Sequence, residues 1–285
     1  MRIAALTMVY NEPVWAPIWT RHYAAQLGAD HCYMLDHGSD DGSTTNLPAP
    51  LHLVRLPRSP LDEEWRLQTI TAQVITLLQT YDAVIHTDAD EILIADPARW
   101  TGLRAWATAG PPDVVTAIGL DVQHLPDQEP ALDLTHPLGT QRRWVRFASA
   151  MCKPAWVRRP VTWSPGFHSS DAPLVLNGLY LLHLRYADLA FGLNRLARSR
   201  SQAFASPDIG LHQRVPDTEF TAMMHAIADL PRRPGPLTTD AAPLRPWLNQ
   251  LFASRLTRED ARYKLDLSLN GDELWDGRHL LHAMS

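Results

Sequence analysis

An acidic cluster interrupts an apolar run near the end of the first third of the chain. Residues 84–93 read Val-Ile-His-Thr-Asp-Ala-Asp-Glu-Ile-Leu, which puts three carboxylates within four residues. If residues 81–87 form a buried strand, the chain leaves the sheet at Asp88, and alternation puts Asp88 and Asp90 on the same side. Ligands of open α/β sheets bind at this end of a strand. Two converging carboxylates there can bind a hard divalent cation, which in turn binds phosphate oxygens. The alternative is a solvated turn, which is the more common role of an isolated Asp-x-Asp.

Strand-length apolar runs alternate with helical patterns up to this cluster. The expected strands are Ile3–Val9, 31–35, 51–56 and 83–87, and the expected helices are Trp15–Leu27 and 63–81. This order is typical of an α/β protein with a mainly parallel central sheet flanked by helices. Because the carboxyl ends of parallel strands share one edge, the polar loops that begin at Asn11, Asp36 and Asp88 should face one crevice.

The remaining sequence predicts elements with less regular spacing. Apolar runs predict strands at 114–120, 144–150, 154–158 and 179–184, and helical patterns cover 97–107, 186–205 and 247–264. The proline- and acid-rich stretch 125–143 is interpreted as a long loop that forms a flap. We therefore expect a catalytic domain at residues 1–205 and a C-terminal extension, mostly helix and loop, at 206–285.

Charge and hydropathy exclude several classes of partner. The 285 residues carry a net charge of −5, so a nucleic-acid-binding function is not expected. No apolar run reaches the roughly 18 residues that span a bilayer, and the N-terminal run lacks a signal-peptide pattern, which favours a cytoplasmic protein. The arginine-rich helix near residues 195–200 leaves an acidic partner, anionic lipid headgroups in a peripheral membrane contact, and water as alternatives.

Several segments together resemble one enzyme family. They are Asn11-Glu12 at the end of a strand, the loop Leu-Asp-His-Gly-Ser-Asp-Asp-Gly-Ser at 35–43, and the segment His-Thr-Asp-Ala-Asp-Glu-Ile-Leu at 86–93. In this order they resemble the motifs of GT-A fold glycosyltransferases, nearest to families 2 and 92. Segments 151–154, 166–168 and 182–186 are similar to the Lys, Gly-x-His and His-Tyr-Arg segments of family 92. The likeness covers residues 3–200 and departs from the family at His37, where many relatives have Asp or Asn.

The resemblance implies a GT-A (Rossmann-like) fold and a metal-dependent glycosyltransferase. Such an enzyme moves a sugar from a nucleotide-sugar donor, here a UDP-sugar by preference, to a glycan or another hydroxyl acceptor. An inverting reaction is favoured, although the sequence also permits a retaining one. A divalent cation that chelates both phosphates would stabilise the leaving diphosphate. Mn²⁺ is favoured over Mg²⁺ because a late histidine often joins the metal in this family.

The same resemblance assigns metal ligands on the donor side. Asp88 is expected at the ribose, a bridging water or the metal, and Asp90 at the metal itself. His183 is the first candidate for the late histidine, and His168 is the second. Glu91 is expected to pack or to cap a following helix rather than to bind metal.

Further residues are expected to bind the nucleotide or to act on the acceptor. Asn11, Glu12 and Asp36 are expected near the nucleotide. Lys153 and Arg185 either neutralise the diphosphate or belong to a solvated basic surface. The general base of an inverting enzyme is a carboxylate on the acceptor face, for which the candidates are Asp121 and Asp171, with unnamed residues equally open.

Two other functions compete with this interpretation. A non-catalytic nucleotide- or sugar-binding module with the same fold would bind nucleotide without transferring sugar. Another phosphate-handling α/β transferase would show different motifs. A haloacid-dehalogenase-like phosphatase carries its Asp-x-Asp after the first strand, and a sugar nucleotidyltransferase carries a Gly-rich basic loop where this chain has Tyr-Asn-Glu-Pro at 10–13.

Overall fold

A computed structural model describes residues 1–208, 210–233, 235, 237, 242–254, 256–257 and 262–284. Within these residues, eleven strands form one sheet in the order β10-β13-β7-β6-β8-β4-β1-β2-β3, with β9 paired to β6 and β5 paired to β9. The strands are β1 (Ile3–Val9), β2 (Cys32–Asp36), β3 (His52–Arg55), β4 (Ala83–His86), β5 (Glu91–Ala95), β6 (Val114–Gln123), β7 (Trp144–Phe147), β8 (Pro154–Val157), β9 (Leu176–His183), β10 (Arg232–Arg233) and β13 (Leu274–Asp276). A separate antiparallel pair is formed by β11 (Leu256–Thr257) and β12 (Tyr263–Lys264).

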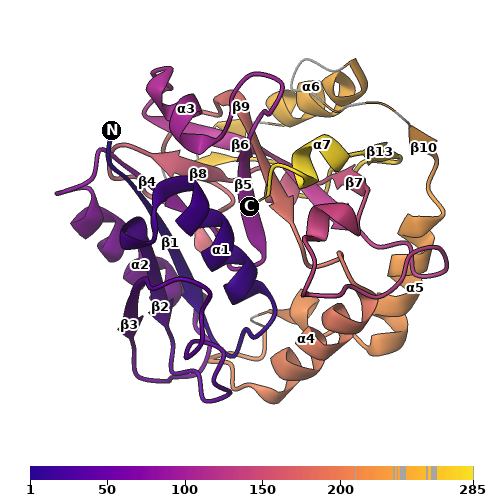
Figure 1. Ribbon diagram of the computed structural model, residues 1–285, viewed down its shortest axis with the longest axis horizontal. Helices are drawn as coiled ribbons and strands as arrows, with labels where there is room; N and C mark the ends of the chain where they lie inside the picture. The colour runs from indigo at the N-terminus through magenta and orange to yellow at the C-terminus, as the bar shows by residue number, and fades with distance from the viewer. Residues whose placement is uncertain are drawn as a thin grey trace.

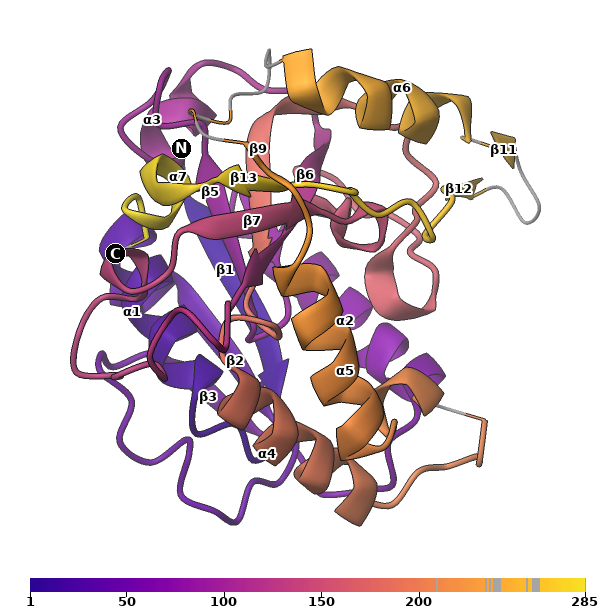
Figure 2. The same ribbon diagram turned by 90° about the vertical axis from the view of Figure 1, so that its right-hand side faces the viewer.

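Helices cover both faces of this sheet (Figures 1 and 2). They are α1 (Trp15–Leu27), α2 (Glu63–Leu77), α3 (Leu103–Thr108), α4 (Leu189–Ser201), α5 (Asp217–Ala228), α6 (Arg245–Ala253) and α7 (Arg278–Leu281). Alternate residues of β1 face opposite sides, since Ile3 and Ala5 pack in the core cluster of α1 while Ala4 and Leu6 pack in that of α2. Figure 2 shows β1 between α1 and α2, with α4 and α5 toward its carboxyl end.

The predicted α/β class with a central sheet flanked by helices is confirmed. Strands β3, β2, β1 and β4 are parallel neighbours, as the sequence pattern predicts. Beyond β4 the sheet is mixed, because β8 and β7 run antiparallel to their neighbours while β9 runs parallel to β6. The bounds of β1 and α1 match the predicted ranges.

The apolar run after the acidic cluster forms a strand. Glu91 begins β5, whose five buried residues pair antiparallel with β9, so the expected helix cap at Glu91 is wrong. Ile92, Leu93 and Ile94 are buried together, and β-branched residues favour a strand in such surroundings. The apolar run is too short for its periodicity to distinguish a strand from a helix.

Other expected elements differ at their ends or in their role. The helices expected at 63–81 and 97–107 are shorter, ending at Leu77 and beginning at Leu103 respectively. The helix expected at 247–264 ends at Ala253, and its residues 255 and 258–261 lie outside the described residues. The flap interpretation of 125–143 is wrong, because Leu132 and Leu138 of this stretch pack in the main core cluster with α1 and α7.

The residues after 205 contribute to the central sheet. β13 pairs antiparallel with β7, and β10 pairs parallel with β13. Leu280 and Leu281 of α7 are buried in the same core cluster as α1. In the described ranges, the helices are all too short or too polar to cross a membrane.

Helix α1 anchors the acidic segment at both of its ends. Trp19 Nε1 donates to Thr87 Oγ1 (2.9 Å), and the Tyr23 hydroxyl lies 3.2 Å from the same oxygen. The Tyr23 hydroxyl also accepts from Leu93 N (2.9 Å), and His22 Nε2 donates to Leu93 O (3.1 Å). These contacts are buried, so they fix where the chain leaves β4 and enters β5.

The buried His22 predicts a loss of stability in acid. Burial lowers the pKa of His22 to about 4, against about 6.5 in an unfolded chain. The unfolded state therefore binds a proton that the folded state does not bind between these two values. This contribution to the free energy of unfolding is constant above pH 7 and falls by up to about 3 kcal/mol as the pH drops from 6.5 to 4.

Urea unfolding at pH 7, 5.5 and 4.5 measures this effect. In His22→Gln, an amide replaces the titrating nitrogen, and the fall between pH 7 and 4.5 should become shallower by the His22 contribution. Subtracting the variant from the wild type cancels the titration of other groups. Parallel pH profiles of the two proteins would contradict the assignment.

Candidate functional site

Two adjoining cavities lie at the carboxyl ends of β1 and β4. The smaller, of about 230 Å³, is lined by residues 8–12 and by α4, and the larger, of about 490 Å³, is lined by Met151, Lys153, residues 165–166 and the segment around His183. Both linings include Glu63, Arg66, Asp88, Arg195 and Gln213. The acidic cluster therefore stands where the two cavities meet.

The loop after β1, which begins at Asn11, and the loop after β2 are joined directly by hydrogen bonds. Asn11 N donates to Ser39 Oγ (3.0 Å), and the Asn11 amide exchanges two hydrogen bonds with Asp40. Glu12 N donates to Ser43 Oγ (3.2 Å). Asn11 holds a left-handed backbone with φ of 50°, which a short polar side chain tolerates better than a bulky one. The structure thus brings the Asn11-Glu12 segment and the 37–44 loop together beside the smaller cavity.

Asp36 shapes this loop from beneath it. Its fully buried carboxylate accepts from Ser39 N (2.8 Å), from Thr44 Oγ1 (2.9 Å) and from Arg55 Nη1 (3.2 Å). Among the described residues, the linings of the two cavities do not include Asp36. In the structure its carboxylate contacts position the loop, and its expected place near the nucleotide stays a prediction.

Asp88 is held between two cations. It forms an ion pair with Arg66 and a second one with Lys153 Nζ (3.2 Å). Burial alone would raise the pKa of Asp88, but Arg66 and Lys153 outweigh it and hold the pKa well below its usual range. Lys153 also donates to Glu91 Oε1 (2.6 Å), while Glu91 Oε2 accepts from Asp88 N (3.1 Å). Lys153, expected at the diphosphate, is thus directed at the acidic cluster.

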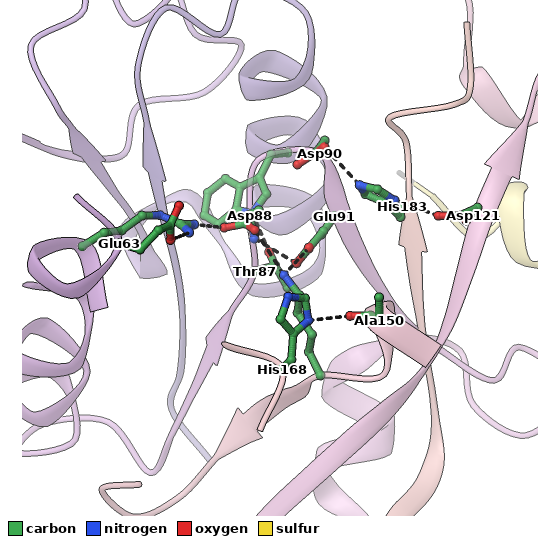
Figure 3. A network of polar contacts seen from close by, with 12 residues as sticks. Glu63, Thr87, Asp88, Asp90, Glu91, Asp121, Ala150, His168 and His183 are labelled. Carbon is green, nitrogen blue, oxygen red and sulfur yellow. Dashed lines mark hydrogen bonds and ion pairs between the residues drawn. The ribbon is translucent and has the colours of Figure 1, made fainter. Parts of the chain in front are cut away.

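Asp90 faces a histidine that a second carboxylate orients (Figure 3). Asp90 Oδ2 lies 3.3 Å from His183 Nε2, and His183 Nδ1 donates to Asp121 Oδ1 (2.8 Å). The sheet produces this line, because β9 lies between β5 and β6 and puts His183 beside Glu91 on one side and Asp121 on the other. Burial lowers the pKa of His183, but the bonds to Asp121 and Asp90 outweigh it and raise the pKa to about 9.

The two candidate bases occupy different places. Asp121 lies behind His183 and within 3.5 Å of Arg146, where it orients the imidazole ring. Asp171 accepts from Thr162 N (3.2 Å) and pairs with Arg159 (3.6 Å) on a loop. The described residues around the two cavities do not include Asp171. The structure brings Asp121 into the cluster and leaves Asp171 outside it.

His168 and Arg185 line the larger cavity. His168 Nδ1 donates to the carbonyl oxygen of Ala150 (2.7 Å), which turns the ring as Figure 3 shows. Gly166 is required beside it, because a Cβ at this position would lie 2.7 Å from the His168 ring. Burial lowers the pKa of Arg185. Both side chains are placed to contact a ligand in this cavity.

The donor set at Asp90 fits a divalent cation in part. No group of three or more His, Cys, Asp and Glu side chains among the described residues could hold a metal ion. Asp90 and His183 nevertheless present an oxygen and a nitrogen 3.3 Å apart, and Asp121 supports the other ring nitrogen, as carboxylates commonly do for metal-bound histidines. A cation here would take two protein ligands and complete its shell with phosphate oxygens and water.

The sequence interpretation named Lys153 and Arg185 but missed three other basic side chains of the site, Arg66, Arg195 and Arg198. Arg195 pairs with Asp90 and lies 3.7 Å from Glu12, and Arg198 pairs with Glu12 (3.3 Å). Burial raises the pKa of Glu12, although both arginines oppose the shift. Arg195 and Arg198 are three residues apart on a predicted helix, so they lie on one face of it. This spacing is the feature of the sequence that could have indicated a shared role. Arg66 of α2 carried no such signal, because its partner Asp88 is distant in sequence.

Comparison with known proteins adds little at this point. The sequence matches no protein-family model and no curated protein. Among solved structures, the chain is similar to one described as a mannose-1-phosphate geranyltransferase from Thermus thermophilus, with a TM-score of 0.29 and 10% sequence identity. The match covers 70% of this chain and 62% of that one. A TM-score this low identifies neither a family nor an activity.

Because Lys153 and Glu91 form a buried ion pair, we expect that removing the charge of one partner strongly destabilises the protein. Both side chains are buried, with 8% and 3% exposure. Lys153→Met leaves Glu91 buried without its cation, so the free energy of unfolding should fall by about 3–5 kcal/mol. The double variant Lys153→Met/Glu91→Leu removes both charges and should recover much of the loss.

Chemical unfolding of the wild type, the Lys153→Met protein, the Glu91→Leu protein and the double variant at pH 7 checks this prediction. Lys264→Met removes a lysine from an exposed position and serves as the control, with a smaller expected loss than in the Lys153→Met protein. A double variant that is less stable than the Lys153→Met protein would show that the pair is not the cause.

Proposed function

We propose that this protein is a metal-dependent glycosyltransferase that moves a sugar from a nucleotide-sugar donor to a glycan or another hydroxyl acceptor. The observation that carries the proposal is the Asp90–His183–Asp121 line, of which Asp90 and His183 line the larger cavity next to its junction with the smaller one at Asp88. The carboxyl edge of an α/β sheet is where such ligands bind. The order of motifs described from the sequence supports the GT-A assignment.

The two cavities suit the two halves of such a reaction. The smaller is bordered by Tyr10, Asn11 and Glu12, to which the 37–44 loop is tied, and it suits the nucleotide. The larger, beside His168 and Arg185, suits the transferred sugar and the acceptor. Their junction at Asp88 is then the place of the diphosphate, and UDP is our favoured nucleotide.

The cation would be held by Asp90 and His183, with Mn²⁺ favoured over Mg²⁺ because one ligand is an imidazole. When bound, it supplies Lewis-acid stabilisation of the charge that develops on the leaving diphosphate. Asp121 keeps the His183 ring turned toward Asp90. Arg66 and Lys153 add positive charge on the other side of Asp88.

The contacts of the candidate carboxylates favour Glu63 as the general base over Asp121 and Asp171, the two candidates from the sequence. Asp121 is engaged by His183 and Arg146, and Asp171 lies on a loop with Thr162 and Arg159. Glu63, at the start of α2, also pairs with an arginine, Arg66 (3.4 Å), but it lines both cavities and keeps 26% of its side chain exposed. In an inverting reaction, this carboxylate would accept the proton of the acceptor hydroxyl.

Release of nucleoside diphosphate from a panel of UDP- and GDP-sugars, with Mn²⁺ and candidate glycan acceptors, tests the proposal. Turnover with at least one donor is expected, together with loss of turnover in excess EDTA and its return on addition of Mn²⁺. A non-catalytic module would bind UDP in calorimetry and show no turnover. That result with every donor and acceptor would refute the glycosyltransferase assignment.

We expect that replacing Asp90 causes a large loss of activity. Asp90→Ala removes a ligand oxygen of the cation, so kcat should fall about 1,000-fold, a magnitude typical of lost transition-state charge stabilisation. Asp121→Asn leaves the ligands in place but alters the support of His183, and should weaken Mn²⁺ binding by about 10- to 100-fold. Asp229→Asn, on the exposed end of α5, is the control and should match the wild type. Unchanged turnover in the Asp90→Ala protein would remove the metal assignment.

A further inference from the structure

A third cavity lies beside β5, apart from the proposed site. It has a volume of about 390 Å³, and its walls come from α1, from β5, from the chain before and at the start of α3, and from Ala283. Among the described residues, none that lines this cavity also lines either of the two cavities at the acidic cluster. Cavities of this volume are large enough to hold a small molecule.

One edge of β5 is not paired with another strand. Among the described strands, β5 pairs only with β9. Asp96 N, directly after β5, donates to Gly178 O (2.9 Å), so the even-numbered residues of this segment direct their backbone groups at β9. The backbone groups of the odd-numbered residues Leu93 and Ala95 therefore face the opposite way, on the side of α1 and the cavity.

Leu93 and Ala95 differ in what meets these backbone groups. At Leu93, the Tyr23 hydroxyl accepts from the N–H, and the His22 ring donates to the carbonyl oxygen. Ala95 is 3% exposed and lines the cavity, and within the described ranges no side chain or backbone group bonds its N–H or its carbonyl oxygen. Buried backbone groups are almost always paired, with protein, water or a ligand. The cavity therefore offers one donor and one acceptor, side by side, to a molecule inside it.

The rest of the cavity wall is mostly apolar and includes one aromatic ring. Ile94 and Leu103 are buried side chains of this wall. The Trp100 ring packs against Gly178, where a Cβ would lie 2.4 Å from it, and the Arg99 guanidinium lies 4.2 Å from the ring centre. These two contacts hold the Trp100 ring in place. A flat apolar ring system can pack against such a wall.

We propose that this cavity is a binding site for a compact apolar ring that carries a hydrogen-bond donor and an acceptor on one edge, as a lactam does. The carbonyl oxygen of the ligand accepts from Ala95 N, and its N–H donates to Ala95 O, in the pattern that an added strand would use. The ring lies against Trp100 and Leu103. The site does not rest on sugar transfer, so the transferase assay and the test of this site have independent outcomes.

Two bicyclic probes of the same shape test the inference. Oxindole carries a lactam N–H and C=O, whereas indane has neither and serves as the matched control. Each probe is titrated into ¹⁵N-labelled protein while the backbone amide signals are followed, with Ala95 as the reporter. Two variants are titrated in the same way. Ala283→Trp puts a bulky side chain on the cavity wall, and Ala253→Trp makes the same change at an exposed position of α6. Thermal unfolding confirms that each variant is folded.

The expected results differ between the probes and between the variants. Oxindole should move the Ala95 amide signal and bind about tenfold more tightly than indane, a gain that two hydrogen bonds of modest net strength supply. Ala283→Trp should lower the affinity for oxindole by about tenfold or more, because the indole fills space that the probe needs. Ala253→Trp should bind oxindole as the wild type does.

Three results would overturn the inference. The first is an Ala95 signal that oxindole does not move, which leaves water as the partner of this residue. The second is equal affinity for oxindole and indane. The third is a folded Ala283→Trp protein that binds oxindole as tightly as the wild type. If Ala283→Trp fails to fold, the comparison of oxindole with indane in the wild type carries the test.

Discussion

The pairing of buried carboxylates with cations from distant elements is the constraint on which the site depends. Charged groups are stable in a protein interior only when they are paired and hydrogen-bonded. The carboxylates of the acidic cluster come from one short segment between β4 and β5, with Glu12 beside them. Their partners come from α2, from the residue before β8, from β9 and from α4. Each of these elements must therefore meet the end of β4, which brings the cavity walls together.

This constraint also explains which features follow from sequence and which do not. The bounds of β1 and α1, and the meeting of the loops at Asn11, Asp36 and Asp88, come from local periodicity and from the geometry of parallel strands. The His183 assignment rests on family resemblance, and strand pairing supplies its neighbour Asp121. Local patterns carry no information on which distant cation pairs with Asp88 or Asp90.

The expectations that differ from the structure share a cause. Glu91 follows two aspartates in a run too short to show its period, and pairing with β9 decides that it begins a strand. The sequence predicts Asp36 as the first residue of a loop, but it is the last residue of β2, and the loop after it turns back and uses its carboxylate. Asp171 follows a motif at close range, yet its loop carries it to Arg159 instead of the cavities. In each case strand pairing or loop contacts that the residue pattern does not show decide where the side chain lies.

The two partners of Asp90, His183 and Arg195, are positioned by different kinds of element. His183 is fixed by the ladder of β9 between β5 and β6. Arg195 reaches Asp90 from a helix outside the sheet, at the end of a long side chain with several rotatable bonds. The sheet thus positions His183 at Asp90, and the helix positions Arg195 there. Asp90 is therefore paired from two sides, by a side chain that the sheet holds and by one that a separate helix brings to it.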